Sequence, residues 1–325
     1  MANLFKNKTI LITGGTGSFG SNFVKYLLKN SQAKKIIVLS RDELKQSKMK
    51  EEIKDERLRL FIGDIRDLQR LQRAFTGVDI VVHAAALKQI PLIEYNPMEA
   101  IKTNIMGTAN VINAAIDNNV EKVLLISSDK AVNPINLYGA TKLCAEKIFI
   151  QANSYAAGKK TKFSCVRYGN VIGSRGSVVP LFLKQKEKGV LSITDKRMTR
   201  FWLTLEQGVK FVSNCINRMR GGEIFIPKLP STKIVDLAKV IAPKAKIETI
   251  GIRPGEKLHE ILLSPEETAH SKEFDKYFVI ETEFLFWGGK YPKGGKSVPD
   301  DFKYSSDTNK HWLTEEELKK IIDNI

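Results

Sequence analysis

Short apolar runs alternate with amphipathic segments over the first 170 residues. The runs are typical of buried strands and lie at residues 8–13, 35–40, 58–62, 79–83, 122–127 and 163–168. Between them, apolar positions recur at helical spacing at residues 19–29, 43–53, 68–75, 98–118 and 138–156. Strands that alternate with helices form βαβ crossovers, so the pattern predicts an α/β fold with a doubly wound parallel sheet.

The regular alternation of predicted strands and helices ends after Gly169. Helices are predicted at 180–188 and 205–219, a basic turn running into a helix at 251–263, and a last helix at 315–322, where Thr314 and Glu317 fit a capping box. We therefore predict a sheet domain at residues 1–170, with segments returning from the second half. A smaller lobe at 171–325 would bind the substrate.

Composition and charge narrow the class of protein. The chain of 325 residues is 42% hydrophobic and 27% charged, as expected of a folded protein with a sizeable core. Lys and Arg number 52 against 36 Asp and Glu, and the net charge of +16 favours nucleic acid, anionic lipid or phosphorylated small molecules as partners. A solvated basic surface without a partner explains the charge equally well.

Cysteine usage and hydropathy predict a cytoplasmic protein. The three cysteines form no CxxC pair, which favours a reducing compartment. No apolar segment typical of a signal peptide precedes the first strand. The longest apolar stretch, at 78–87, is interrupted by Asp79 and His83, so no membrane span is expected.

A glycine-rich loop joins the first strand to the first helix. Gly14, Gly17 and Gly20 are spaced three apart, which allows a tight turn, a close approach of backbone N–H groups to a pyrophosphate and tight helix packing. No Gly-Lys-Ser/Thr follows, which disfavours a Walker A loop. The spacing resembles the short-chain dehydrogenase/reductase superfamily. It implies a Rossmann-type domain whose loop binds a dinucleotide, with Thr16, Ser18 and Phe19 also at the cofactor.

The end of the second strand bears on the choice of cofactor. An acidic residue there would bind the ribose hydroxyls of NAD, whereas Ser40-Arg41, with Lys45 one turn further on, suits the 2′-phosphate of NADP. We therefore favour NADP over NAD, although Asp42 is an acidic neighbour. The resemblance also implies adenine contacts for Asp64 and Ile65. Close backbone approach to the cofactor is expected after the fourth strand, at Ala84, Ala85 and Ala86.

Tyr138 and Lys142 form a Tyr-x-x-x-Lys pair on one helix face. An ammonium near a phenol stabilises the phenolate, so Tyr138 can take a proton from a hydroxyl while hydride leaves the same carbon. Together with the glycine loop and a fifth strand that ends in Ser127-Ser128, this pair resembles the extended short-chain dehydrogenases that act on nucleotide sugars.

The next two residues, Asp129-Lys130, resemble the inverting UDP-N-acetylglucosamine 4,6-dehydratases. The resemblance covers nearly the whole chain, in the segments ILITGGTGSFG, SRDELKQS, HAAALK, NPMEAIKTNIMGT, SSDKAVNPINLYGATK, RYGNVIGSRGSVVP, MTRFW and GIRPGEKLHE. It implies tightly bound NADP, UDP-N-acetylglucosamine as substrate and a homo-oligomer such as a hexamer. It also implies a place in pseudaminic-acid-type sugar synthesis and flagellin glycosylation. The plainer interpretation of Asp129-Lys130 is an exposed ion pair.

We hypothesise a dehydration without net redox change. Tyr138 deprotonates the C4 hydroxyl as hydride moves to NADP, and the ketone formed acidifies the C5 proton. Lys130, reacting neutral, removes that proton, while Asp129, reacting protonated, protonates the departing C6 hydroxyl. Hydride return to C6 and proton delivery to the other face of C5 give a UDP-4-keto-6-deoxy-L-hexosamine.

A UDP-sugar carries a pyrophosphate, which arginine binds in bidentate geometry. The candidates are Arg200, Arg253 and Arg175. The resemblance implies sugar contacts for Lys88 and Asn170, and Glu256 is a candidate for the uridine ribose; each is also interpretable as an ordinary surface residue.

No metal is predicted, because the four histidines lack the spacing of zinc ligands. Of these, His83 at a strand end is expected to be a packed structural residue. Two other functions stay open: a UDP-N-acetylhexosamine 4-epimerase, which would leave Asp129-Lys130 without a task, and a non-catalytic NADP-sensing or nucleic-acid-binding module. The chain has no recognisable nucleic-acid motif, so we expect neither nucleic acid nor a membrane as partner.

Overall fold

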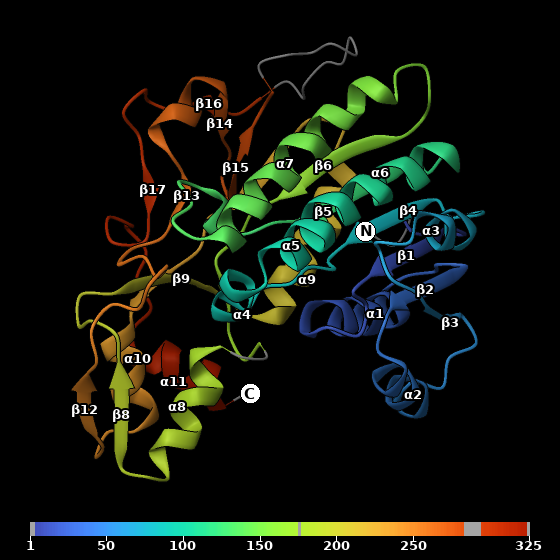
Figure 1. The fold of residues 1–325 in the computed structure, drawn as a ribbon. Helices are drawn as coiled ribbons and strands as arrows, with labels where there is room; N and C mark the ends of the chain where they lie inside the picture. The colour runs from blue at the N-terminus through green and yellow to red at the C-terminus, as the bar shows by residue number, and fades with distance from the viewer. Residues whose placement is uncertain (1–3, 175–176, 283–293, 324–325) are drawn as a thin grey trace.

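The computed structural model describes residues 4–174, 177–282 and 294–323. Seven parallel strands form the centre of its main sheet: β1 (Thr9–Thr13), β2 (Lys35–Ser40), β3 (Leu58–Ile62), β4 (Ile80–His83), β5 (Lys122–Ile126), β6 (Lys162–Val166) and β10 (Ile224–Pro227). Three more strands extend it: β15 (Tyr277–Ile280), β14 (Ser271–Glu273) and β16 (Lys296–Ser297). The order is β16-β14-β15-β10-β6-β5-β4-β1-β2-β3 (Figure 1). It reverses between β1 and β4, the position where α/β sheets bind ligands.

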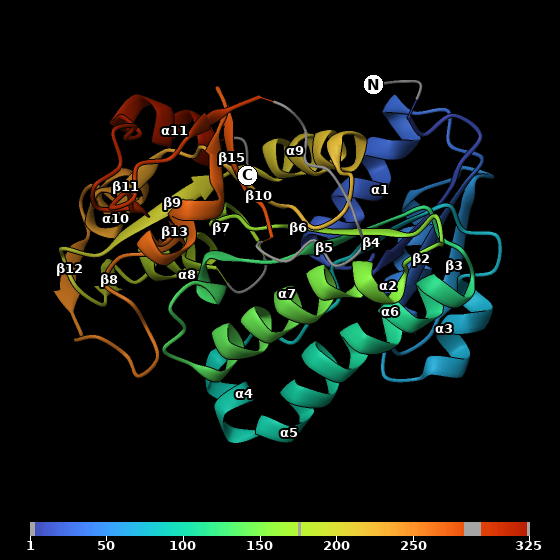
Figure 2. The same cartoon turned by 90° about the horizontal axis from the view of Figure 1, so that it is seen from above.

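Helices cover both faces of this sheet (Figure 2). One face carries α1 (Ser18–Asn30) and α9 (Leu205–Arg218), which pack against each other, and α2 (Glu43–Glu52) adds Met49 to the core there. The other face carries α3 (Leu68–Ala74), α6 (Gly107–Asp117) and α7 (Leu137–Tyr155). The predicted doubly wound α/β fold is therefore confirmed.

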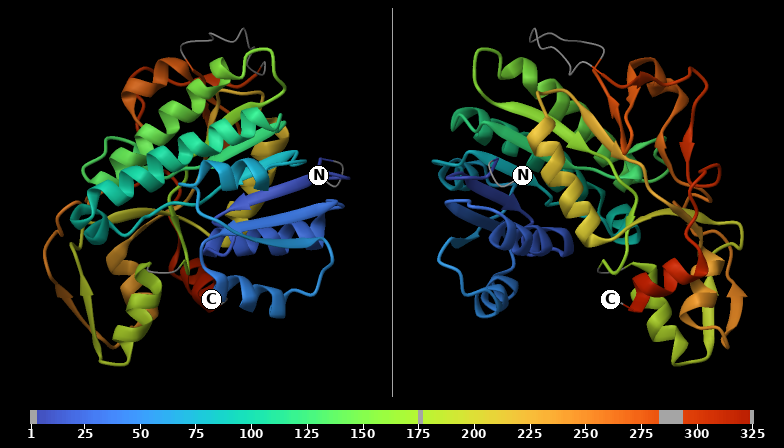
Figure 3. Two further views of the ribbon diagram at one scale, coloured as in Figure 1. Left: turned by 45° about the vertical axis from the view of Figure 1, so that its right-hand side comes forward. Right: turned by 180° about the vertical axis from the view of Figure 1, so that it is seen from behind.

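A smaller lobe stands at one end of the molecule, away from β2 and β3 (Figure 3). It has its own core and contains α8 (Val178–Lys186), β8 (Val190–Ile193), α10 (Ile234–Ile241), β12 (Lys246–Thr249) and α11 (Glu315–Asp323). Short strands connect it to the sheet domain: β7 (Asn170–Val171), β9 (Thr199–Leu203), β11 (Ser231–Lys233), β13 (Ile261–Leu263) and β17 (Tyr304–Ser305). The predicted capping box is present: Thr314 N donates to Glu317 Oε2 (2.8 Å) and Glu317 N donates to Thr314 Oγ1 (3.2 Å).

The single helix predicted at 98–118 is wrong in its first half. The chain forms α4 (Ile90–Tyr95), α5 (Pro97–Ala100) and a π-helical segment, Ile101–Met106, before α6 begins at Gly107. Asn104 explains the irregularity, because its side chain bonds both Leu87 N (2.8 Å) and Leu87 O (2.9 Å), and its carbonyl accepts from Thr108 Oγ1 (2.6 Å). These contacts hold the segment against the sheet edge, where π-helical turns often mark functional sites.

The helix predicted within 251–263 is absent. Gly251 and Gly255 adopt positive φ angles of 86° and 78°, and residues 261–263 form β13 instead. The backbone carbonyls between Gly255 and β13 accept hydrogen bonds from distant segments. Thr199 N donates to Leu258 O (3.1 Å) and Ser306 N to Glu260 O (2.8 Å). Tertiary partners thus take the acceptors that a helix would use.

Candidate active site

A cavity of about 740 Å³ opens over the ends of β1, β2, β4 and β5. We call it the first cavity. All the residues predicted to bind the cofactor line it: Gly14, Thr16, Gly17, Ser18, Phe19, Gly20, Ser40, Arg41, Lys45, Asp64, Ile65, Ala84, Ala85, Ala86, Tyr138 and Lys142. The structure therefore brings this set together at the topological switch point.

The glycine loop is shaped by close backbone packing. Gly14 has a φ of 67°, and a Cβ there would lie 2.9 Å from the Cα of Ala85. A Cβ on Gly20 would lie 2.5 Å from the Cα of Gly15. Helix α1 begins directly after Gly17, so the positive end of its dipole faces the cavity.

Two cations stand at the rim of the first cavity. The Arg41 side chain is 53% exposed and its Nη1 lies 3.6 Å from Asp64 Oδ2. Lys45 Nζ lies 2.5 Å from Asp42 Oδ2. Ser40, in contrast, is buried, and its hydroxyl accepts a hydrogen bond from Gln46 (3.0 Å). Arg41 and Lys45 are thus near each other at the end of β2, each beside a carboxylate.

Helix α7 carries the predicted Tyr-Lys pair. Its N-cap Asn136 accepts from Gly139 N (2.7 Å), which starts the helix one residue before Tyr138. Burial raises the pKa of Tyr138 to about 12, against the opposing effects of the Lys130 ammonium and a hydrogen bond with Ser128. Burial lowers the pKa of Lys142 to about 8, and its Nζ donates to Ile126 O (2.6 Å). The Lys130 ammonium is thus a cation that favours the phenolate of Tyr138, in addition to the Lys142 of the motif.

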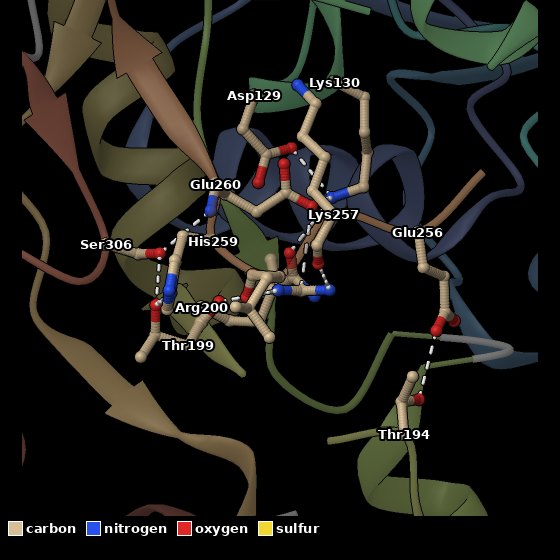
Figure 4. A network of polar contacts seen from close by, with 12 residues as sticks. Asp129, Lys130, Thr194, Thr199, Arg200, Glu256, Lys257, His259, Glu260 and Ser306 are labelled. Carbon is tan, nitrogen blue, oxygen red and sulfur yellow. Dashed lines mark hydrogen bonds and ion pairs between the residues drawn. The ribbon is translucent and has the colours of Figure 1, made fainter. Parts of the chain in front are cut away.

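Asp129 and Lys130 form a short 3₁₀ turn, Asp129–Ala131, directly after β5. Their side chains are largely buried, with 1% of Asp129 and 22% of Lys130 exposed, so the interpretation as an exposed ion pair is wrong. Lys130 Nζ lies 2.9 Å from Asp129 Oδ1 and 3.2 Å from Glu260 Oε1 (Figure 4). Burial alone would lower the pKa of Lys130, but the two carboxylates raise it above its usual value.

A second cavity of about 510 Å³ adjoins the first, and Ile90, Lys130, Asn170 and Ser177 line both. The predicted substrate residues Arg200, Arg253 and Glu256 line the second cavity, whereas Lys88 lines the first. Glu256 accepts from Thr194 Oγ1 (3.1 Å), and Arg253 Nη1 lies 3.8 Å from Glu256 Oε1. Arg175, the third predicted arginine, lies outside the described residues.

Arg200 is buried and extensively bonded to the protein itself. Its guanidinium donates to Thr199 O (2.7 Å), Leu258 O (3.1 Å) and Lys257 O (2.8 Å), and its Nε lies 3.7 Å from Glu260 Oε1. These contacts hold the 256–260 segment against β9 (Figure 4). Arg200 therefore shapes the wall of the second cavity, in addition to offering a positive charge.

Sequence reasoning missed two groups of site residues. Glu260 and Lys257 lie in the GEKLHE segment quoted above, where only Glu256 drew attention. Thr103 lines the first cavity from the π-helical segment. The hydroxyls of Thr103 and Ser127 are buried without a hydrogen-bond partner in the described part of the chain. No pattern in the sequence distinguishes them from ordinary core positions.

His83 is a structural residue, as expected. It is buried between Thr13 Oγ1 (2.6 Å) and Thr108 Oγ1 (3.0 Å), and burial lowers its pKa to about 3. Within residues 4–174, 177–282 and 294–323, no three His, Cys, Asp or Glu side chains are grouped to hold a metal ion. No helix among them is long and apolar enough to cross a membrane.

Comparison with known proteins places these features in a family. The family described as polysaccharide biosynthesis protein matches residues 10–282. The UDP-N-acetylglucosamine 4,6-dehydratase (inverting) of Campylobacter jejuni is 52% identical over 99% of both chains. The UDP-glucose 4-epimerase of Rickettsia akari is 41% identical over 98% of this chain and 96% of its own. Among solved structures, Pen from Bacillus thuringiensis superposes with a TM-score of 0.91, at 40% identity over 98% of both chains.

The match to the Campylobacter enzyme confirms the resemblance inferred from the motifs, and the superposition confirms the Rossmann-type fold with its smaller C-terminal lobe. The chain therefore belongs to the polysaccharide biosynthesis family of extended short-chain dehydrogenases/reductases, alongside the inverting UDP-N-acetylglucosamine 4,6-dehydratases.

Proposed function

We propose that this protein is a hydro-lyase that converts UDP-N-acetylglucosamine into a UDP-4-keto-6-deoxy-L-hexosamine, with inversion at C5. One observation carries the proposal. The buried Asp129–Lys130 pair lines the first cavity together with Tyr138, and Lys130 also lines the second. An acid and a base are needed there for elimination of water, and a simple 4-epimerase has no use for them.

The first cavity fits a nicotinamide dinucleotide. The glycine loop and the N-terminus of α1 suit a pyrophosphate. The buried hydroxyls of Thr103 and Ser127 line the cavity as polar groups not bonded elsewhere in the described chain. Arg41 and Lys45 at its rim favour NADP over NAD, because both can bind a 2′-phosphate. Held by these residues, NADP would supply the acceptor for the C4 hydride and its donor to C6.

Tyr138 and Lys142 serve the oxidation at C4. Tyr138 takes the proton of the C4 hydroxyl as hydride leaves that carbon, and because the product keeps the C4 ketone, this proton balances the one that C5 later gains. Its pKa of about 12 means that the phenol is protonated at rest, so a nearby cation must stabilise the phenolate during the reaction. Lys130 supplies such a charge, and Lys142 orients the end of β5 through Ile126 O (2.6 Å).

The Asp129–Lys130 pair serves the elimination. One group takes the C5 proton, which the C4 ketone has acidified, and the other protonates the C6 hydroxyl, which departs as water. The pair gains one proton and loses one, so a proton shift along the 2.9 Å contact between them restores its starting state. After hydride return to C6, protonation of C5 on its opposite face gives the inverted product.

The second cavity receives the UDP group. Arg253 at its rim supplies charge for the diphosphate, and buried Arg200 adds a positive potential behind it. Glu256 is the candidate for the uridine ribose, and Lys88 and Asn170 are candidates for the sugar. NADP and the UDP-sugar are both phosphate-rich anions, so we assign part of the +16 charge to binding them. We further propose that the enzyme acts in the cytoplasm as a homo-oligomer, in pseudaminic-acid-type sugar synthesis.

The second candidate function is 4-epimerisation, since a relative at 41% identity bears the name UDP-glucose 4-epimerase. Mass spectrometry after incubation with UDP-N-acetylglucosamine separates the two, because dehydration removes the mass of one water and epimerisation removes none. NMR of the product made in deuterated water then reports the configuration at C5 and the deuterium placed there. An unchanged mass with inverted C4 would refute the dehydratase, and retained C5 configuration would refute the inverting class.

A further inference from the structure

Lys130 has the contacts of an ammonium rather than of a free amine. Its Nζ has three acceptors: Asp129 Oδ1 at 2.9 Å, Glu260 Oε1 at 3.2 Å and Asn170 Oδ1 at 3.3 Å. An ammonium offers three N–H groups and has no lone pair. Three acceptors therefore match the protonated form and leave no lone pair with which Lys130 could accept a proton from C5.

Asp129 has the opposite character. Its Oδ1 accepts from Ser128 Oγ (2.6 Å) and Lys130, which are contacts of a carboxylate. Its Oδ2 is buried and has no hydrogen-bond partner in the described part of the chain. Asp129 lines the first cavity together with Tyr138. The group with an unused lone pair at the reacting centre is thus the carboxylate.

Glu260 is the residue that fixes this arrangement. Its backbone is held on both sides by Ser306: Glu260 N donates to Ser306 Oγ (2.9 Å), and Ser306 N donates to Glu260 O (2.8 Å). Its side chain is 3% exposed and lies between Lys130 and Arg200, as Figure 4 shows. The C-terminal segment thereby places a second carboxylate against an ammonium whose own neighbour is Asp129.

We propose that Glu260 is a positioning residue that holds Lys130 protonated, so that Asp129 is the base at C5 and Lys130 the acid at C6. This proposal rests on the proposed dehydratase function and reverses the roles that the sequence suggested for the pair. Asp129 takes the C5 proton as the C5–C6 double bond forms and the C6–O bond breaks, and Lys130 donates its proton to the departing hydroxyl. Asp129 then returns its proton to Lys130 across their 2.9 Å contact, which restores the pair, and the proton that Tyr138 took from the C4 hydroxyl balances the one added to C5.

The charges around Lys130 show why the Glu260 carboxylate is needed to keep Lys130 protonated. Arg200 opposes the ammonium. Burial lowers the pKa values of Lys88 and Lys257 and the charge of Lys130 lowers them further, so three other cations face the cluster. Asp129 and Glu260 are the two carboxylates that oppose them. A charge 3.2 Å away changes a pKa by about one unit even at the dielectric constant of water, and by more in a buried site. Removing Glu260 therefore weakens the ammonium substantially.

The first experiment separates proton removal from water loss. Variants D129N and K130M are incubated with UDP-N-acetylglucosamine in deuterated water, and deuterium at C5 and dehydrated product are both measured. We expect D129N to lose C5 exchange by about a hundredfold or more, while K130M keeps exchange within about tenfold and loses dehydration. Bound NADP serves as the folding control. C5 exchange is expressed relative to the C4 oxidation measured in the same variant, because Lys130 also acts on Tyr138. Loss of C5 exchange in K130M with exchange retained in D129N would overturn the proposal.

The second experiment tests Glu260 through the ratio of C5 exchange to dehydration as pH rises. In E260Q the ratio should climb by about tenfold at a pH at least one unit lower than in the wild type, because neutral Lys130 can no longer donate while Asp129 still accepts. E260D keeps the carboxylate, so the pH at which the ratio rises should shift less than half as far as in E260Q. The control E273Q removes an exposed carboxylate bonded to Lys228 (2.6 Å), outside both cavities, and should leave the ratio unchanged.

Identical ratios in E260Q and the wild type, or an equal shift in E260D, would refute the role of the charge. Where E260Q does not fold, as judged by thermal melting and bound NADP, E260D alone decides: a small downward shift supports the proposal, and none refutes it. Failure of the proposed function has a separate signature, because the wild type would then release no water from UDP-N-acetylglucosamine in any of these assays.

Discussion

Replacing Arg167 with methionine tests the internal link between the catalytic helix and the second half of the chain. Arg167 is 1% exposed and makes five hydrogen bonds: two with Glu146 on α7 (2.7 and 3.2 Å), two with Glu267 (both 2.9 Å) and one with Leu262 O (3.1 Å). Glu146, one turn after Lys142, is equally buried. R167M therefore leaves at least one carboxylate buried without a partner.

Breaking a buried ion pair on one side costs about 3–5 kcal/mol of unfolding free energy. An unfolding entropy of about 2.1 cal/mol/K per residue gives about 0.7 kcal/mol/K for 325 residues, so the expected fall in Tm is about 4–7 °C. Differential scanning calorimetry in the presence of added NADP measures it. The double variant E146Q/R167M should recover part of the loss, because the Glu146 carboxylate that has lost Arg167 is then no longer buried as a charge. A Tm within about 1 °C of the wild type in R167M would refute the reasoning.

Three further predictions concern the cofactor site and stability. G14A should lose bound NADP by about tenfold or more and lower the Tm, because its φ of 67° and the 2.9 Å contact with Ala85 exclude a Cβ; cofactor content after gel filtration measures this, and full NADP content would contradict it. R41A should weaken NADP binding by about tenfold while NAD binding changes less than about twofold, as measured by fluorescence titration; equal losses would speak against a 2′-phosphate contact. The pKa of His83 is lowered from 6.5 to about 3, so the unfolded chain binds the extra proton between these values and stability falls as the pH drops from 6.5 to 3. Urea titrations should show up to about 5 kcal/mol less of this loss in H83Q than in the wild type, and parallel pH curves would contradict the assignment.

Local chemistry in the sequence predicted much of the fold and the cofactor site. The strands at 35–40 and 58–62 appear with the predicted bounds, since β-branched runs between turns have few alternatives. Gly14 and Tyr138 were recognisable for a similar reason, because each belongs to a short motif whose members are near in sequence. The parallel topology then brought these motifs to one edge of the sheet.

Features that depend on distant partners were not predictable in this way. Glu260 meets Lys130 only because Ser306 and Arg200 fix its backbone and side chain. The absent helix before β13 has the same origin, since its carbonyls bond residues such as Thr199. Local propensity favoured a helix there, but the segment is not helical because its carbonyls accept long-range hydrogen bonds instead.

The alternation of sheet strands and lobe segments has a consequence for how the enzyme can change. After β6 the chain leaves for the lobe and returns as β10, leaves again and returns as β14 and β15, and leaves a third time after β16 to form α11. The lobe is therefore built from two insertions in the sheet and a third segment that follows β16, and it is not a module that could be cut off and exchanged. Recombination at residue 170 would split the sheet between β6 and β10. New sequence within either insertion leaves strands β1 to β6, which carry the proposed dinucleotide site, unchanged. Sugar preference is thus most easily altered by changing the sequence of the two insertions, because each is anchored at both ends in the same sheet.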